Sequence, residues 1–347
     1  MAKNIMKILI LGGTKFLGRH LTTAARAKNH EVTLFNRGKH SSENFENVEQ
    51  IHGDRNSDLD KLENRSWDAC VDTCGYLPQT VKASAEALKN SVKQYVFISS
   101  ISAYADFSNP DYDENAPVAT LTGEQLKRVA GIDPKGEITA VALEEMYGAL
   151  KALCEQEVSK AMPGKTLIVR SGLIVGSYDP TDRFTYWVMR TTRGGEVLAP
   201  GNPNRFVQFV DVRDLSEWIV KMIEDAESGV YNATGKPFAL TMEQMLEEIK
   251  FVGKSDATFT WADEDFLKRE TVQEWSEMPL WMPESGKKAS GFLSANIDKA
   301  AAKNLKFRPL NETIKDTLHW RQTKSDELKA GINAAREKEL LRKWHEQ

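Results

Sequence analysis

Short apolar runs alternate with helix-like stretches through the first half of this chain, and this alternation is the strongest constraint on its fold. The runs are typical of buried strands, and the stretches between them have the period of amphipathic helices. Strands that alternate with helices favour a doubly wound parallel sheet, because each crossover helix must cover one face of the sheet. The predicted strands are Lys7–Leu11, Glu31–Phe35, Val48–His52, Ala69–Asp72, Gln94–Ile98 and Thr166–Arg170, and the predicted helices are Phe16–Ala27, Gln79–Lys89 and Leu143–Lys160.

The second half of the chain has a different character. From Ser177 onward the apolar runs shorten, and tryptophan and proline accumulate. No internal repeat or low-complexity linker separates the halves, which favours two interleaved lobes over two tethered ones. The tail from Asp326 to His345 spaces its apolar residues as an amphipathic helix does. This helix packs either on its own lobe or on a partner.

The composition excludes several classes of protein. With 347 residues, 41% of them hydrophobic and 28% charged, the chain is typical of a globular protein. No apolar stretch approaches the ~20 residues that a membrane helix needs. Three cysteines without metal-ligand spacing predict free thiols in a reducing cytoplasm and no metal site. A formal net charge of −4 gives no overall attraction to nucleic acid, which is therefore not the expected partner.

A glycine-containing loop, "LILGGTKFLGRH" (Leu9–His20), lies between the first predicted strand and the first predicted helix. Glycine permits a tight turn there, and the amino end of the helix offers unpaired N–H groups to a pyrophosphate. The same pattern also occurs in simple tight turns. Its position between strand and helix favours a dinucleotide-binding loop.

Three residues bear on the choice of dinucleotide. An acidic residue that binds the ribose hydroxyls of NAD is expected after the second strand, but Asn36 and Arg37 stand there. Asn36 does not repel a 2′-phosphate, and Arg37 can pair with one. Lys15 adds a second cation within the glycine loop. Arg37 is also compatible with a solvated turn, yet the two cations together favour NADP over NAD.

A possible catalytic set follows further along the chain. "VFISSISAY" (Val96–Tyr104) ends the fifth predicted strand, and "YGALK" (Tyr147–Lys151) begins a helix. Tyr147 and Lys151 share a helix face, where the lysine ammonium stabilises the phenolate form of the tyrosine. Tyr147 is therefore a candidate general acid/base. A serine at the strand end can hydrogen-bond a substrate carbonyl or alkoxide oxygen.

On these motifs the chain resembles the extended short-chain dehydrogenases/reductases, the NAD-dependent epimerase/dehydratase family. The loop with lysine at its centre is similar to an atypical branch that includes bacterial epimerase-like proteins and chloroplast stem-loop RNA-binding proteins. The shared motifs are "GGTKFLG", Gly53-Asp54, "SSISAY", "YGALK", "RSGLIVG", "VQFVDVRDL" and "GVYNATG".

The resemblance implies roles for individual residues. It implies Ser100, Tyr147 and Lys151 as catalytic residues and a contact of Asp54 with the adenine. It also implies a homodimer formed through the Tyr/Lys helix. The loop chemistry and the resemblance together give a cofactor-binding set of Gly12, Thr14, Lys15, Phe16, Leu17, Asn36, Arg37, Asp54 and Lys151. Lys15 and Asn36 depart from the family pattern, because many members have glycine and an acidic residue at these two positions.

Two further departures from the family pattern are informative. Nucleotide-sugar dehydratases carry Thr-Asp-Glu where this chain has Ser100-Ile101-Ser102, so the carboxyl pair for water elimination is absent. The segment between Ser100 and Tyr147 is longer than is usual in the family. Its extra part, about 105–141, forms either a flap by the active site or a surface excursion.

Candidate substrate residues lie in the second half of the chain. The loop Gly176–Trp187 follows a strand end, where ligands bind in α/β proteins. It carries polar and aromatic side chains of the types that sugars prefer, although each is also common as a structural residue. Together they favour a hydroxylated substrate and are compatible with an anionic one. The candidates are Asp182, Arg183 and Trp187, with Asp179 beside them, and Arg205 and Gln208 further on.

These observations predict an α/β enzyme with a Rossmann-type sheet and a smaller, interleaved C-terminal substrate lobe. Its expected activity is that of an NAD(P)-dependent oxidoreductase acting on a carbohydrate-like alcohol or ketone. The alternatives are a sugar or nucleotide-sugar epimerase that retains its NAD(P), and an RNA-binding protein on a dehydrogenase scaffold. The predicted division is a cofactor domain at 1–175 with return segments near 205–235, a substrate lobe at 176–325 and a helix at 326–347.

Overall fold

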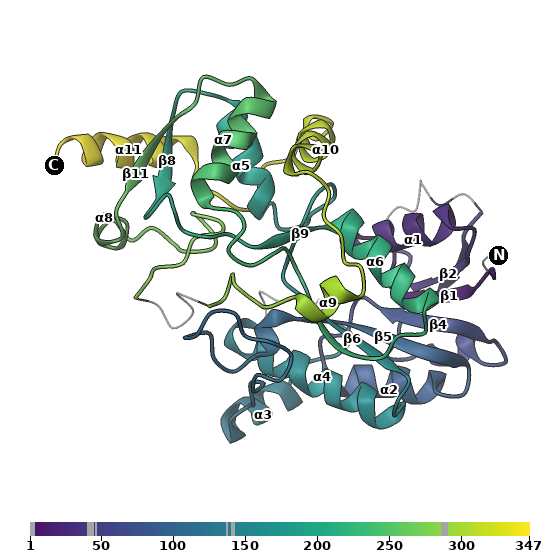
Figure 1. The fold of residues 1–347 in the computed structure, drawn as a ribbon. Helices are drawn as coiled ribbons and strands as arrows, with labels where there is room; N and C mark the ends of the chain where they lie inside the picture. Colours follow the sequence, from purple (N-terminus) through teal and green to yellow (C-terminus); the bar gives the residue numbers. More distant parts are fainter. Residues whose placement is uncertain (1–3, 40–44, 46, 137, 140–142, 286–290) are drawn as a thin grey trace.

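A seven-stranded parallel sheet forms the centre of the first lobe in the computed structural model (Figure 1). The structure describes residues 4–39, 45, 47–136, 138–139, 143–285 and 291–347. The strand order is β10-β6-β5-β4-β1-β2-β3, and every neighbouring pair is parallel. The strands are β1 (Lys7–Leu11), β2 (Glu31–Asn36), β3 (Glu49–His52), β4 (Trp67–Asp72), β5 (Val92–Ser100), β6 (Thr166–Ser171) and β10 (Gly229–Ala233).

Helices cover both faces of this sheet, as Figure 1 shows. On one face α1 (Phe16–Ala27) packs against α6 (Val212–Glu224), and on the other α2 (Pro78–Leu88) packs against α4 (Tyr147–Ala161). The Rossmann-type, doubly wound sheet predicted from the alternation is therefore confirmed. Its strands are buried on both faces, which is why they appear in the sequence as continuous apolar runs.

Strand β5 illustrates this two-sided burial. Val96 and Ile98 lie in the core beneath α1 and α6, whereas Tyr95 and Phe97 lie in the core beneath α2 and α4. Return segments complete the sheet: β10 forms one edge, and α9 (Asp298–Ala302) packs against β10.

The second lobe is built around its own core, which includes Trp187 and Trp281. Figure 1 places its helices and short strands together, away from the seven-stranded sheet. Two parallel pairs of short strands occur, β8 (Glu196–Pro200) with β11 (Thr258–Ala262) and β7 (Leu173–Val175) with β9 (Phe209–Asp211). The remaining helices are α3 (Gly123–Ala130), α5 (Arg183–Thr192), α7 (Met242–Gly253), α8 (Glu264–Arg269), α10 (Leu310–Gln322) and α11 (Ala334–His345), with short 3-10 turns at Leu59–Leu62, Ile101–Ala103 and Glu144–Met146.

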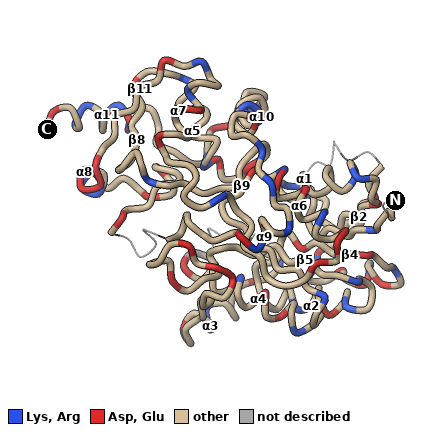
Figure 2. Tube along the Cα trace, viewed as in Figure 1, with Lys and Arg blue, Asp and Glu red and all other residues tan. Residues whose placement is uncertain are grey.

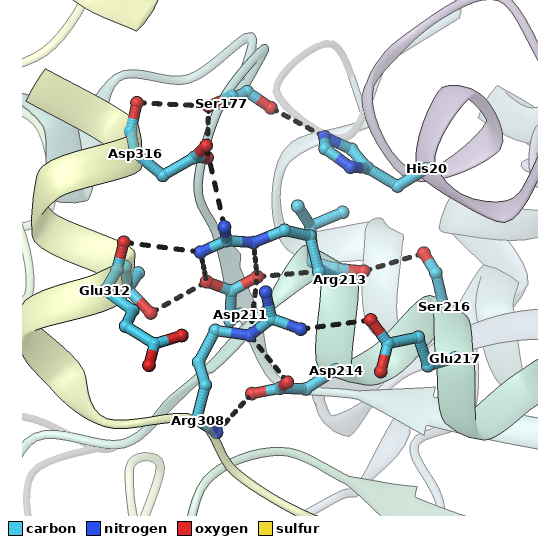
Figure 3. Close-up of polar contacts among 12 residues, drawn as sticks. His20, Ser177, Asp211, Arg213, Asp214, Ser216, Glu217, Arg308, Glu312 and Asp316 are labelled. Atoms are coloured by element: carbon cyan, nitrogen blue, oxygen red, sulfur yellow. Dashed lines mark hydrogen bonds and ion pairs between the residues drawn. The ribbon is translucent and has the colours of Figure 1, made fainter. Parts of the chain in front are cut away.

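A network of ion pairs joins the two lobes where α6 meets α10 (Figure 3). Asp211 caps α6 and accepts a hydrogen bond of 2.7 Å from the Thr313 hydroxyl on α10. Arg213 pairs with Asp211 at 2.7 Å and with Asp316 of α10 at 3.5 Å. These contacts fix α10 relative to the sheet that α6 covers.

The C-terminal helix is shorter than predicted. Helix α11 begins at Ala334, with Asn333 accepting a hydrogen bond from the Arg336 backbone N–H as its cap, and residues 326–333 are not helical. Leu340 and Leu341 lie in the core of the second lobe. The helix therefore packs on its own lobe, as the first of the two alternatives held.

A buried ion pair fastens α11 to α5. The Arg190 Nε donates to the two carboxylate oxygens of Glu337 at 2.8 and 2.6 Å, and the Leu198 backbone N–H donates to the same carboxylate. Removing one member of a buried pair leaves the other charge without compensation. We expect Glu337→Gln to lower the free energy of unfolding by about 3 kcal/mol, measured by urea denaturation.

Glu339 on the same helix supplies the matched control. Its carboxylate is 45% exposed and pairs with Arg336 and Lys343 at the surface. Glu339→Gln should change the free energy of unfolding by less than about 1 kcal/mol. Equal effects of the two substitutions would contradict the anchoring role of Glu337.

Candidate active site

The loop after β1 has the backbone geometry of a dinucleotide-binding turn. Gly12 and Gly13 have φ values of +98° and +89°. A Cβ at Gly18 would stand 2.5 Å from the Cα of Gly13, so α1 lies directly against the turn. No side chain caps the amino end of α1, and no acidic residue occupies its first turn. These unpaired N–H groups fit a pyrophosphate.

The residues predicted to select the cofactor lie beside this turn. Lys15, the N-cap residue of α1, is exposed, as is Arg37 at the end of β2. Neither forms an ion pair with a described residue. Asn36 accepts a 2.8 Å hydrogen bond from the Gly38 N–H, while its buried Nδ2 has no partner among the described residues. An orphaned amide donor at this place fits a ribose hydroxyl or a 2′-phosphate.

Asp54 belongs to a turn that is hydrogen-bonded internally. Its Oδ1 accepts from both the backbone N–H and the Nδ2 of Asn56, each at 2.9 Å. Asn56 in turn donates to the Pro134 carbonyl at 2.9 Å and accepts from the Thr80 hydroxyl. Part of the inserted segment is therefore tied to the loop predicted to contact the adenine.

A buried ion pair that the sequence analysis missed lies at the end of β4. Arg55 donates two hydrogen bonds to the Asp72 carboxylate, at 2.7 and 2.6 Å, and Tyr95 donates a third at 2.9 Å. Burial acts to raise the pKa of Asp72, but Arg55 and the hydrogen bonds outweigh it and the pKa lies below its usual value. The sequence did contain a sign of this pair, because a charged residue, Asp72, ends the otherwise uncharged strand segment Ala69–Asp72.

The three candidate catalytic residues come from neighbouring elements at the carboxyl end of the sheet. Ser100 ends β5, and its hydroxyl oxygen accepts from the Ser102 N–H at 3.1 Å. Tyr147 and Lys151 lie on the first turns of α4. The buried Lys151 donates to the carbonyls of Ile98 at 2.6 Å and Gly75 at 2.8 Å. One of its three N–H groups thus remains available to another acceptor.

The inserted segment packs against the helix that carries Tyr147. Val129 of this segment lies in a core with Leu143 and with Leu150 of α4, and Tyr147 packs against that core. Earlier in the segment, Phe107 packs with Phe292 at a ring separation of 5.1 Å. The described part of the segment is thus packed close to Tyr147, which favours the flap over the surface excursion.

Two of the predicted substrate residues are buried and have their polar groups bonded within the protein. Trp187 is fully buried in the second lobe, where its Nε1 donates to the Pro279 carbonyl at 2.8 Å. Gln208 is 2% exposed and bonded to the backbone of Gly235 and Ala295. Both positions are structural, because no face of either side chain is open to a ligand.

Of the other three predicted substrate residues, Arg183 and Arg205 are partly exposed, whereas Asp182 is buried. Burial lowers the pKa of Arg205, and Glu284, Glu264 and Glu274 act in the opposite direction. Asp182 accepts from the Lys329 backbone N–H at 3.1 Å. Arg183 is half-buried, and its guanidinium lies 5.3 Å from the centre of the Trp275 ring.

The comparisons with known proteins agree with this geometry. The NAD dependent epimerase/dehydratase family matches residues 8–234, so the chain belongs to this family of enzymes. The chain is also 25% identical over 260 residues to the chloroplast stem-loop binding protein of 41 kDa b of Arabidopsis thaliana. That match covers 68% of this chain and 61% of the relative, so the chain spans less than two thirds of the relative's length.

Solved structures share the fold. A UDP-glucose 4-epimerase is 15% identical with a TM-score of 0.66, covering 92% of this chain and 100% of its own. UDP-N-acetylglucosamine 4-epimerase from Bacillus cereus is 17% identical with a TM-score of 0.62, covering 91% and 99%. MoeE5, solved with UDP-glucose and NAD, has the same four values. The predicted family resemblance is confirmed.

Within the described residues, no group of three or more His, Cys, Asp or Glu side chains could hold a metal ion. No helix in that part of the chain combines the length and apolar character needed to span a bilayer. The three cysteines are free.

The Arg55–Asp72 pair is expected to make the stability of the fold depend on pH. Because the folded pKa of Asp72 is depressed, the pair stabilises the fold above about pH 4 and this stability is lost as the pH falls through the folded pKa. In Arg55→Met the carboxyl is buried without its cation, so its pKa rises above the unfolded value. Stability at pH 7 should fall by about 3–5 kcal/mol, and should recover partly on lowering the pH to 5.

Urea denaturation at the two pH values measures this effect. Arg65→Met is the matched control, because Arg65 pairs with Glu49 at the surface with 41% of its side chain exposed. If Arg55→Met lost stability equally at both pH values, the ionised pair would not be the cause.

Proposed function

We propose that this chain is an NADP-preferring oxidoreductase of the epimerase/dehydratase family, acting on a carbohydrate-like alcohol or ketone. One observation carries the proposal. An uncapped helix terminus beside a glycine turn lies at the same sheet edge as Ser100, Tyr147 and Lys151. In a parallel sheet that edge is where ligands bind.

The roles proposed for the three catalytic residues follow from the hydrogen bonds that they form. When bound, the nicotinamide supplies or accepts the hydride. Tyr147 gives or takes the proton of the substrate oxygen, because its hydroxyl has no hydrogen-bond partner among the described residues. Ser100 orients that oxygen, since its own oxygen already accepts from Ser102 and its O–H is left to donate. Lys151, fixed by two carbonyls, directs its third N–H to the ribose.

The proposed cofactor contacts use the remaining residues of the set. The turn Gly12–Leu17 and the amino end of α1 hold the pyrophosphate, and Asp54 lies on the adenine side. Lys15, Asn36 and Arg37 hold the 2′-phosphate. The same proposal assigns residues 1–175, with the return segments near 205–235, to the cofactor and residues 176–325 to the substrate.

The cofactor preference can be measured without knowing the substrate. We expect NADP⁺ to bind at least about tenfold more tightly than NAD⁺, because each charge-assisted hydrogen bond to the phosphate contributes about 1.5–3 kcal/mol. Titration of the protein with each dinucleotide, followed by tryptophan fluorescence, gives the two dissociation constants. Arg37→Ala and Lys15→Ala should each reduce the preference, and Asn36→Asp should reverse it by repelling the phosphate.

Arg26→Ala is the control for these variants. Arg26 is exposed on the last turn of the same helix, α1, far from the glycine turn. Its removal should leave both dissociation constants unchanged. A wild-type protein that binds NAD⁺ as tightly as NADP⁺ would rule out the proposed selection.

The catalytic assignment has a separate test. Tyr147→Phe should lower turnover about 100- to 10,000-fold while leaving the dissociation constant of the cofactor unchanged, because only the acid/base hydroxyl is removed. The assay follows the absorbance of NADPH with the substrate found in a metabolite screen. Tyr76→Phe is the matched control, with its ring 6.4 Å from that of Tyr147. Undiminished turnover in Tyr147→Phe would refute the assignment.

A sugar or nucleotide-sugar epimerase is the second candidate. It is favoured by the similarity to solved 4-epimerases and uses the same residues. An epimerase must keep its cofactor through the catalytic cycle, whereas the oxidoreductase must exchange it. Identification of the nucleotide that is purified with the protein separates the two: NAD retained through dialysis supports the epimerase, and exchangeable NADP supports the oxidoreductase.

RNA binding is less well supported by the distribution of charge. Figure 2 shows lysine and arginine interspersed with aspartate and glutamate over both lobes in that view. Binding to a phosphate backbone draws on a clustered basic surface. The net charge of −4 acts in the same direction.

A further inference from the structure

Arg183 is a cation with no carboxylate partner among the described residues. It is the first residue of α5 and half-buried, with its guanidinium 5.3 Å from the centre of the Trp275 ring. Its side chain forms no hydrogen bond or ion pair with any residue that the structure describes. A guanidinium has five N–H donors, and removing it from water without acceptors is unfavourable.

Other buried arginines of this chain are paired. Arg170 lies 2.8 Å from the Glu155 carboxylate, and Arg190 lies 2.6 Å from that of Glu337. Each of these pairs joins two elements of the fold. Arg183 has no such carboxylate within ion-pair distance in the described part of the chain. A structural role of the same kind therefore does not explain it.

The chain reaches Arg183 after leaving the carboxyl end of β6, whose last residue, Ser171, lies opposite Ser100 in the sheet register. Burial lowers the pKa of Arg183, while Asp179 and Tyr147 act in the opposite direction. The guanidinium is thus within electrostatic range of both the Tyr147 hydroxyl and the Asp179 carboxyl. An anion bound to Arg183 would therefore neutralise a charge that acts on the Tyr147 hydroxyl.

Asp179 is the second incompletely partnered group at this place. It is 3% exposed, and its Oδ1 accepts from the Thr181 backbone N–H at 2.8 Å and from the Thr181 hydroxyl at 2.7 Å. Its Oδ2 is buried and has no partner among the described residues. Burial raises the pKa of Asp179 to about 6, Asp182 acts in the same direction, and Thr181 and Arg183 oppose it.

A hydrogen bond from the C-terminal part of the chain holds the start of α5 in place. Asp182 has a left-handed backbone (φ 56°) and accepts from the Lys329 N–H, and its side chain does not cap α5. The charged groups acting on Asp182 are Arg321, Lys329 and Asp326. The uncapped N–H groups of α5 add partial positive charge next to Arg183.

We propose that Arg183 binds an anionic group of the substrate, a carboxylate or phosphate carried close to the reacting carbon, and that Asp179 modulates this binding through its own ionisation. The proposal deepens the function assigned above and rests on Tyr147 as the acid/base. It adds a substrate class, an acidic sugar or sugar phosphate. The planar fork of Arg183 suits either oxyanion.

Matched ligand pairs test the anion. Binding to the protein saturated with NADP⁺ is measured by calorimetry for UDP-glucuronic acid against UDP-glucose, and for glucose 6-phosphate against glucose. Each pair differs in one anionic group, so the first pair tests a carboxylate and the second a phosphate. We expect the anionic member of at least one pair to bind about tenfold more tightly or better, which corresponds to one charge-assisted contact.

Substitutions then locate the contact. Arg183→Gln should abolish the preference for the anionic ligand, and Arg183→Lys should restore part of it. Arg193→Gln, at the other end of α5 with 57% of its side chain exposed, should keep it. Equal affinities within both pairs for the wild-type protein, or an unchanged preference in Arg183→Gln, would overturn the proposal.

The pH dependence of the ligand affinity is a further test, because a purely structural role of Asp179 would not change it. Above about pH 6 the Asp179 carboxylate offsets the charge of Arg183, and below it the neutral carboxyl does not. The affinity for UDP-glucuronic acid should therefore rise as the pH is lowered from 7.5 to 5.5, a range in which a sugar carboxylate stays ionised. Asp179→Asn should bind tightly at both pH values. A pH-dependent affinity that survives in Asp179→Asn would refute the role of Asp179.

Failure of this proposal is distinguishable from failure of the proposed function. If NADP⁺ binds and Tyr147→Phe loses turnover while the ligand pairs show no preference, the function stands and the anion site does not. If Arg183→Gln does not fold, as judged by circular dichroism, the Asp179→Asn measurement still decides the question.

Discussion

Helix α1 can lie against the turn after β1 only because Gly18 carries no side chain. A Cβ on Gly18 would overlap the Gly13 backbone at 2.5 Å, and one on Gly13 would meet Leu34 at 2.6 Å. This close approach directs the amino end of α1 to the carboxyl edge of the sheet. The parallel order then brings the ends of β2 and β5 to the same edge, with Asn36 and Ser100 as their last residues. The candidate site follows from this one contact.

The sequence predicts the sheet well because burial on both faces leaves a strong local pattern. The bounds expected for β1 and α1 agree with the structure, whereas β5 extends beyond Gln94–Ile98 at both ends. The predicted C-terminal helix began too early, at Asp326 instead of Ala334, for a physical reason. Leu328 packs against the core of the second lobe, and Ile332 lies within it, from a segment that is not helical. Their spacing imitates a helical face, although Asn333 caps the helix that begins after them.

The candidate site was predictable where its residues belong to a local motif and not where they depend on distant partners. Tyr147 and Lys151 are one helical turn apart, so their shared face is visible in the sequence. Gln208 has suitable chemistry for a ligand, but its amide is used by the backbone of Gly235 and Ala295. Only the three-dimensional structure shows which polar side chains are already satisfied and which, like Arg183, are not.

The contacts that hold α5 also set an order of events during synthesis. All seven strands of the sheet are available once residue 233 has been made, so the lobe that contains the sheet can form early. Helix α5 is translated before that point. However, Asp182 can accept its hydrogen bond from Lys329, and Arg190 can pair with Glu337, only after those later residues have been made. Loop closure over 147 residues is slow compared with local helix formation. The sheet can thus form before Arg183 reaches its final position, so the second lobe is expected to complete its fold last.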